Sequence, residues 1–189
     1  MMLGLENYYE VSDVRKIVFD LDGAKATATM RDEVVPKACE AIWRKLPLSG
    51  MSIHAKWAAR EFMLHLSGEN RMILEQEGTR DASDIEIEGL GETPHFGAGQ
   101  IFYFHREPGV LRGVQRDYAA EFQRELCELA IFYGHSGPSL QDPGRQPDPS
   151  KQVSIWFATF DEPIPRDFIA RSDAMQYEGN KPLTVKRLQ

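Results

Sequence analysis

The feature that most constrains this fold is a pair of short alternating runs on either side of Asp22-Gly23, between Val14 and Met30. An Asp-Gly dipeptide readily adopts the positive φ angles of a type I′ turn, which joins two antiparallel strands. Pairing outward from this turn places six apolar side chains on one face: Ile17, Phe19, Leu21, Ala24, Ala26 and Ala28. The sequence therefore predicts a hairpin with one buried face.

A single packed helix is predicted over Val35 to Leu46, because Pro36 suits the first helical position and Pro47 ends the run. Its apolar residues recur at helical spacing: Cys39, Ile42, Trp43 and Leu46. One apolar stripe with charges on the other side is typical of a helix that lies on a sheet or closes a barrel end.

Further segments have the alternation or the composition of strands: Met51–Trp57, Glu61–Leu66, Asp84–Glu88, Gln100–His105, Glu125–Tyr133 and Val153–Phe160. If the first two pair directly, one face holds Ile53, Ala55, Trp57, Phe62, Leu64 and Leu66. The opposite face is then polar and holds Ser52, His54, Lys56, Glu61, Met63 and His65. A short helix is also expected over Asp167 to Met175.

These elements predict a mainly β fold, a closed antiparallel β-barrel with one packed short helix and a few helical insertions. The 189 residues fit a single domain whose core spans about residues 12–161. A helical insertion is expected over 106–124, a Pro/Gly-rich mobile loop over 136–152 and a C-terminal extension over 162–189. We expect the basic run Lys181 to Arg187 to be a solvated tail. The core should contain, among others, Ile17, Phe19, Leu21, Cys39, Ile42, Leu46, Ile101 and Phe157.

Charge and composition exclude several classes of partner. The net charge of −7 comes without a cluster of Lys and Arg, which disfavours nucleic acid as a partner. We expect no membrane partner, because no segment is long and apolar enough to span a bilayer. The first residues lack a secretory signal, and Cys39 and Cys127 suit buried reduced thiols, so we expect a cytoplasmic protein.

The order of hairpin, helix with an entering Pro36-Lys37, and second hairpin resembles the cyclophilin barrel. A nearer likeness lies in Pro36 to Pro47 followed by Ile53 to Trp57, which reads Ile-His-Ala-Lys-Trp. This pattern is similar to a bacterial family of unknown function with a cyclophilin-like fold, in which a His-Ala-Arg-Trp segment follows the helix. The resemblance covers about Glu33 to Leu66 and implies a cyclophilin-like barrel, but no activity.

A peptidyl-prolyl isomerase is an alternative that the resemblance brings in. Isomerases of the cyclophilin type use an arginine in a Phe-His-Arg segment and a downstream Gln-Gly-Gly-Asp motif. Here Lys56 follows His54 and Ala55, and Gln-Gly-Gly-Asp does not occur in the sequence. Because lysine lacks the planar fork of a guanidinium, we expect no isomerase centre at His54, Lys56 and Arg60.

The histidines are spaced unlike a metal site. Cupins supply two ligands as His-x-His, whereas these five stand alone: His54, His65, His95, His105 and His135. The sequence also lacks a Gly-x-Ser-x-Gly elbow and a phosphate-binding glycine loop that precedes a helix. We therefore expect no metal, no cofactor and no identifiable catalytic residue.

Polar groups and aromatic rings near the second hairpin suit a small carboxylate- or amide-bearing metabolite or a peptide. The candidate ligand-binding residues are His54, Lys56, Trp57, Arg60, Tyr103, Tyr133 and His135. We expect them to border one concavity at a barrel mouth. The competing interpretation is a non-catalytic assembly or structural module, a homo-oligomer joined by an edge strand or by the C-terminal tail.

Overall fold

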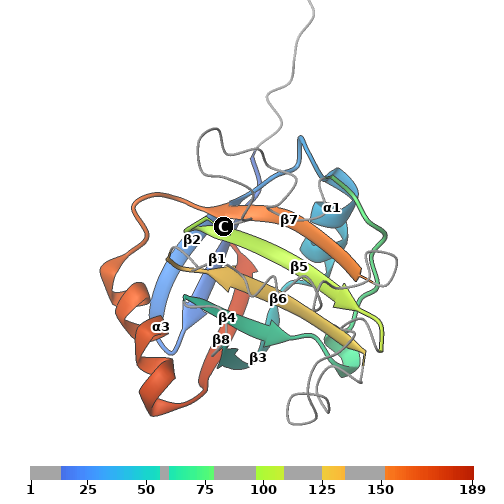
Figure 1. Cartoon of the computed structure of the whole chain (residues 1–189). Helices are drawn as coiled ribbons and strands as arrows, with labels where there is room; N and C mark the ends of the chain where they lie inside the picture. Colours follow the sequence, from blue (N-terminus) through green and yellow to red (C-terminus); the bar gives the residue numbers. More distant parts are fainter. Residues whose placement is uncertain (1–13, 56–59, 79–96, 109–124, 135–151) are drawn as a thin grey trace, which may run out of the picture.

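The computed structural model describes residues 14–55, 60–78, 97–108, 125–134 and 152–189, which form a closed antiparallel barrel of eight strands (Figure 1). The strands are β1 Lys16–Leu21, β2 Ala24–Met30, β3 Leu48–His54, β4 Glu61–His65, β5 Gln100–Arg106, β6 Leu126–Phe132, β7 Gln152–Phe160 and β8 Lys181–Arg187. Around the barrel they follow the order β1-β2-β7-β5-β6-β4-β3-β8. The predicted mainly β, closed antiparallel barrel is confirmed.

The first hairpin has the predicted register. Large apolar side chains of β1 lie opposite alanines of β2 in the pairs Ile17–Ala28, Phe19–Ala26 and Leu21–Ala24. Asp22 and Gly23 have φ angles of 50° and 90°, as a tight hairpin turn requires. All six side chains are buried, so this face of the hairpin points into the barrel.

Two α-helices, α1 Pro36–Lys45 and α3 Arg166–Glu178, lie on opposite sides of the barrel (Figure 1). Helix α1 has the predicted place and buries Cys39 and Ile42. Helix α3 extends three residues beyond its predicted end and buries Phe168, Ser172 and Met175. A 3₁₀ turn, η1, spans Gly68–Asn70.

The start of α1 is stabilised by a residue far along the chain. Val35, at the N-cap position, makes no side-chain capping hydrogen bond. Instead, the carboxylate of Glu77 accepts the backbone N–H groups of Lys37 and Ala38 at 3.2 and 2.8 Å. These two groups are among the donors that a helix leaves without a partner in its first turn.

The basic run that was expected to be a solvated tail is strand β8, and this expectation is wrong. β8 pairs with β1 on one side and β3 on the other, so it closes the barrel. Leu183 and Val185 point inward and are buried, while Lys186 is exposed. The core therefore extends beyond the expected limit at residue 161, and part of the predicted extension belongs to the barrel.

The predicted faces of the second hairpin are also wrong. The observed pairs are Ser52–Leu64, Ile53–Met63 and His54–Phe62. Ser52 and His54 therefore share the inward face with Phe62 and Leu64, whereas Met63 faces outward with Ile53. The pairing continues to Ala55, whose N–H donates to the Glu61 carbonyl at 2.9 Å. A shift of one residue in register moves every side chain to the other face.

The sheet is buried on both faces along β4, β6, β5 and β7. The interior holds the main core, and the predicted core residues Ile17, Phe19, Leu21, Cys39, Ile42, Leu46, Ile101 and Phe157 are all buried in it. The outer face carries a second buried cluster of Phe102, Phe104, Ala130 and Phe132, with Trp156 packed against it. Cys39 and Cys127 are free and buried, as predicted.

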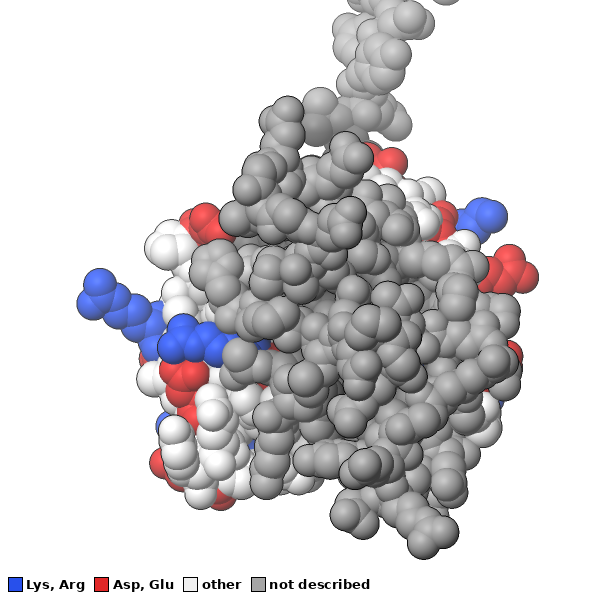
Figure 2. Space-filling view, viewed as in Figure 1, with Lys and Arg blue, Asp and Glu red and all other residues white. Residues whose placement is uncertain are grey.

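Several predicted segments lie outside the described residues: the strand Asp84–Glu88, residues 109–124 of the insertion and residues 136–151 of the loop. In the described part of the chain, no helix has the length and apolar character needed to cross a lipid bilayer. On the face shown in Figure 2, the acidic and basic side chains of the described residues are interspersed.

Candidate functional site

Four side chains from separate parts of the chain form a polar network near the ends of β3 and β6, beside α3. His54 Nε2 lies 2.8 Å from the hydroxyl oxygen of Tyr133, which follows β6. The Tyr133 hydroxyl donates to Asp173 Oδ1 on α3 at 3.0 Å, and Asp173 Oδ2 lies 3.8 Å from Arg60 Nη2. We call these residues, His54, Arg60, Tyr133 and Asp173, the His54 network.

The network runs from the surface into the protein. The Arg60 side chain is 50% exposed, whereas His54 and Tyr133 are buried. Gly134 leaves room for Arg60, because the Arg60 side chain occupies the space that a Cβ on Gly134 would need. The exposed cation therefore lies beside the strand end that carries Tyr133.

Burial sets the charge state of the two inner groups. It raises the pKa of the Tyr133 hydroxyl well above its usual value, so this group stays protonated. Burial also lowers the pKa of His54, although the Ala55 backbone and the Asp173 carboxylate partly oppose this. The imidazole is therefore neutral at neutral pH.

The hydrogen bonds then fix which nitrogen of His54 carries the proton. Tyr133 has one hydroxyl proton and donates it to Asp173, so His54 Nε2 must be the donor to the Tyr133 oxygen. A neutral imidazole has a single N–H, which leaves Nδ1 as an acceptor. Nδ1 is buried and has no hydrogen-bond partner among the described residues. Such an acceptor costs about 1–3 kcal/mol unless a donor reaches it.

The structure brings together only part of the predicted ligand site. His54, Arg60 and Tyr133 are joined in one network. The Tyr103 hydroxyl belongs to another group, because it donates to the Met72 carbonyl at 2.7 Å and accepts the Leu74 N–H at 3.3 Å. Three further predicted residues, Lys56, Trp57 and His135, lie outside the described residues.

Asp173 was not found by sequence reasoning. It lies in a segment with a predicted helical pattern, but that pattern does not indicate which barrel strand the helix covers. The contact with Tyr133 joins residues 40 positions apart, so only the tertiary fold reveals it. A polar residue on the buried side of a predicted helix is the signal that could have marked it.

A second polar cluster, which the sequence did not predict as a unit, lies on the outer face of the barrel. Arg106 Nη1 on β5 donates to Glu128 Oε1 on β6 at 2.8 Å, and His65 Nε2 on β4 lies 3.5 Å from Glu128 Oε2. Glu61, four residues before His65 on β4, is buried on the same outer face, opposite Phe132 of β6. Burial raises its pKa to about 8; the charge of Glu128 adds to this and that of Arg106 opposes it. We call these four residues the Glu61 cluster.

An aromatic row continues from this cluster across β5 and β7. The Arg106 guanidinium lies over the ring of Phe104 at 4.7 Å, and Phe104 stacks on Phe102 with ring centres 5.5 Å apart. Phe102 stacks in turn on Trp156 at 6.2 Å, and Arg31 covers the Trp156 ring at 3.7 Å. The row therefore has a cation over the ring at each end, an arrangement that suits the negative ring faces.

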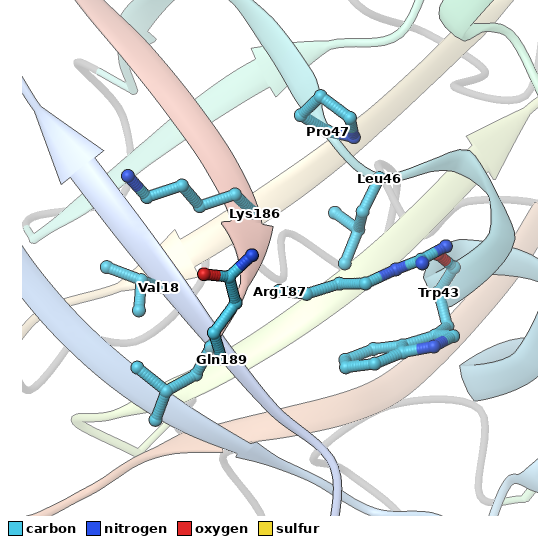
Figure 3. Close-up of a pocket in the computed structure, with 8 residues that line it drawn as sticks. Val18, Trp43, Leu46, Pro47, Lys186, Arg187 and Gln189 are labelled. Atoms are coloured by element: carbon cyan, nitrogen blue, oxygen red, sulfur yellow. The ribbon is translucent and has the colours of Figure 1, made fainter.

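An open groove of about 810 Å³ lies beside the end of α1 (Figure 3). It is lined by Val18, Trp43, Leu46, Pro47, Lys186, Arg187, Leu188 and Gln189. The Arg187 guanidinium donates to the Trp43 carbonyl at 2.9 and 3.2 Å and lies 5.0 Å from the centre of its ring. Because this cation already binds the protein itself, the groove is a weaker ligand site than the His54 network.

Within the described ranges, no three side chains of His, Cys, Asp or Glu are grouped so that they could hold a metal ion. The histidines there instead contact single protein groups. His54 pairs with Tyr133, His105 Nε2 lies 2.9 Å from Glu125 Oε1, and His65 lies near Glu128.

Comparisons with known proteins give a family but no activity. No curated protein matches the chain. A solved structure described as McbB in complex with tryptophan is similar over 90% of this chain, with 14% identity and a TM-score of 0.45. This chain spans 44% of that protein chain. The resemblance to cyclophilins stays a prediction. Residues 17–150, which include β1 to β6, match the family described as "Protein of unknown function (DUF3830)", and the chain belongs to this family.

Proposed function

We propose that this protein binds a small molecule or a peptide with an amide or carboxylate group, at the barrel end where α3 meets β3 and β6. The observation that carries this proposal is the Nδ1 atom of His54, which is buried without a hydrogen-bond partner among the described residues. A buried polar atom of this kind is often satisfied by a ligand or an ordered water. Arg60, half exposed at the same network, supplies a positive charge.

Between the two ligand groups, the amide fits the network better. An amide N–H can donate to His54 Nδ1, while the amide carbonyl accepts from the Arg60 guanidinium. A carboxylate would accept a hydrogen bond from Arg60, but it has no N–H to donate to Nδ1, so two acceptors would face each other. Since Nδ1 is shielded from solvent, a ligand reaches it only when the surrounding residues move. We therefore expect association well below the diffusion limit.

Neither alternative gains support from the contacts of the described residues. The isomerase interpretation depends on the position of Lys56, which lies outside those residues. It stays a prediction for a protease-coupled proline isomerisation assay, with Lys56→Ala as the variant. The assembly interpretation stays a prediction for light scattering over a range of protein concentrations.

A thermal-shift experiment with the full chain tests the proposal, because a ligand of the native state raises the melting temperature. The probes are benzamide, benzoate and benzyl alcohol, which share one ring and differ in the polar group. We expect benzamide to give the largest shift, benzoate a smaller one and benzyl alcohol the smallest.

Variants locate the binding. His54→Leu removes Nδ1 and should abolish the benzamide shift, and Tyr133→Phe, which frees the imidazole, should reduce it. Tyr177→Phe is the matched control, because Tyr177 is exposed on the same helix as Asp173. A benzamide shift that survives His54→Leu, or equal shifts for all three probes, would contradict the proposal.

A further inference from the structure

We infer that the outer face of the barrel holds a second binding site, which takes a primary ammonium group on an apolar body at the Glu61 cluster. This site is separate from the proposed amide site. Glu61 faces outward on β4, whereas Phe62, paired with His54, faces the interior. A ligand at one site therefore does not occupy the other.

Glu128 supplies the acceptor. Its side chain is 1% exposed, and its Oε1 accepts from Arg106 at 2.8 Å. Its Oε2 has no hydrogen-bond partner among the described residues, with His65 Nε2 at 3.5 Å outside hydrogen-bond geometry. A buried carboxylate oxygen without a donor is costly, and an ammonium group brings three N–H donors.

Glu61 lets the cluster adjust its charge to a bound cation. The charges that act on it are Glu128 on β6, which raises its pKa, and Arg106 on β5, which lowers it by less. His65, on the same strand, lies at Glu128. At neutral pH the Glu61 carboxyl keeps its proton, because burial and Glu128 both oppose ionisation. When an ammonium ion binds, Glu61 can release this proton, so one positive charge replaces another.

The surroundings suit the apolar part of such a ligand. Met63 lies between Glu61 and His65 on the outward face, and Phe132 is the partner of Glu61 on β6. The aromatic row starts at Arg106, beside Glu128. A compact ammonium fits better than a guanidinium, because Arg106 already places its guanidinium over the Phe104 ring. A metal ion is less suited, since the described residues offer no three-ligand group.

Isothermal titration calorimetry of the full chain with benzylamine tests the inference, with benzyl alcohol as the neutral analogue. At pH 7, the binding heats measured in phosphate and in Tris should differ, because the two buffers have different heats of protonation. The difference should correspond to the release of close to one proton for each benzylamine bound. Affinity should rise between pH 6 and pH 8, as the proton on Glu61 becomes easier to remove. Benzyl alcohol should bind at least tenfold more weakly.

Two variants and one control assign the binding to the cluster. Glu128→Gln and Glu61→Gln should each weaken benzylamine at least tenfold, and Glu61→Gln should also abolish the proton release. Glu33→Gln, at an exposed site, should change neither quantity. If Glu128→Gln fails to fold, Glu61→Gln alone tests the site. This variant should fold, because glutamine has the shape and the neutral charge of the protonated Glu61 carboxyl.

Other results would overturn the inference: no benzylamine binding, equal binding of benzyl alcohol, unchanged binding in Glu61→Gln, or Mn²⁺ binding at these residues in place of the amine. His54→Leu should leave benzylamine binding intact. The two proposed sites can therefore fail independently.

Discussion

The Glu61 carboxyl is buried, and its burial together with the charge of Glu128 raises its pKa to about 8. In an unfolded chain the same group has a pKa near 4.5. Between these two values the native state binds more protons than the unfolded state. The free energy of unfolding therefore falls as the pH rises from about 4.5 to about 8, and this loss is complete above the folded-state pKa.

We predict that Glu61→Gln flattens this dependence, because the amide copies the shape of the protonated acid and cannot ionise. Urea denaturation at pH 5, 6, 7 and 8.5 measures it. The wild type should lose a few kcal/mol over this range, and the variant much less. Glu33→Gln should follow the wild type. If the free energy of unfolding changes equally with pH in the wild type and in Glu61→Gln, Glu61 ionises in the native state as it does in the unfolded chain.

Phe19 is fully buried and packs edge-to-face on Phe160 with ring centres 5.3 Å apart. Removing its ring leaves a cavity that a closed barrel cannot easily fill, so Phe19→Ala should cost about 3–5 kcal/mol of unfolding free energy. Urea denaturation measures the cost. Val14→Ala serves as the control because Val14 is 58% exposed. A cost below about 1 kcal/mol would be incompatible with this burial.

Among the elements, α1 depends on a residue of the segment that follows η1. Glu77 accepts two N–H groups in the first turn of the helix, where an anionic group also interacts favourably with the helix dipole. We predict that Glu77→Ala costs about 1 kcal/mol, as loss of an N-cap does. Thermal unfolding followed by circular dichroism measures it. Glu75→Ala, two residues away and exposed, should have no effect; equal effects would refute the capping role.

Elements that depend on neighbours in sequence could be predicted. The Asp22-Gly23 turn sets the register of β1 and β2 by itself, and the apolar stripe from Cys39 to Leu46 suffices to identify α1. The inward position of His54 could not be predicted. It follows from how far the β3–β4 pairing continues toward Ala55 and Glu61, which the alternation alone leaves open.

The two polar clusters could likewise be predicted only in part, because they depend on contacts between residues far apart in the sequence. Sequence reasoning selected His54, Arg60 and Tyr133 for their chemistry, but not Asp173, because the position of α3 depends on packing. It placed Glu61 on the same face as His54, whereas the structure puts them on opposite faces of the sheet. Strands buried on both faces, such as β5, read as continuous apolar runs, so their outer rows give no periodic signal.

For the whole molecule, the decisive contact is the one between β8 and β1. β8 has only two buried positions, Leu183 and Val185, among charged residues and Pro182, which is why its sequence resembles a solvated tail. Yet β8 pairs with β1 on one side and with β3 on the other, and each of these strands would otherwise have only one paired edge. A short strand is recruited here because a closed barrel leaves no unpaired edge.

We predict that Val185→Asp destroys cooperative folding, because it places an unpaired charge in the barrel interior. Lys186→Asp, one residue further on the outward face, should leave the unfolding transition cooperative. Near-ultraviolet circular dichroism during a thermal melt distinguishes the two outcomes. If both variants melt alike, β8 does not close the barrel in solution.

Closure by β8 also has a consequence for biosynthesis. Roughly 160 residues separate the end of β1 from the start of β8, so a ribosome needs about 8–30 s to make the missing partner. During that time β1 has left the exit tunnel without its neighbour β8, and β3 emerges later with the same neighbour missing. Nascent chains are thus most open to mispairing with one another in this interval, and we expect chaperone occupancy to peak there and to end when β8 emerges.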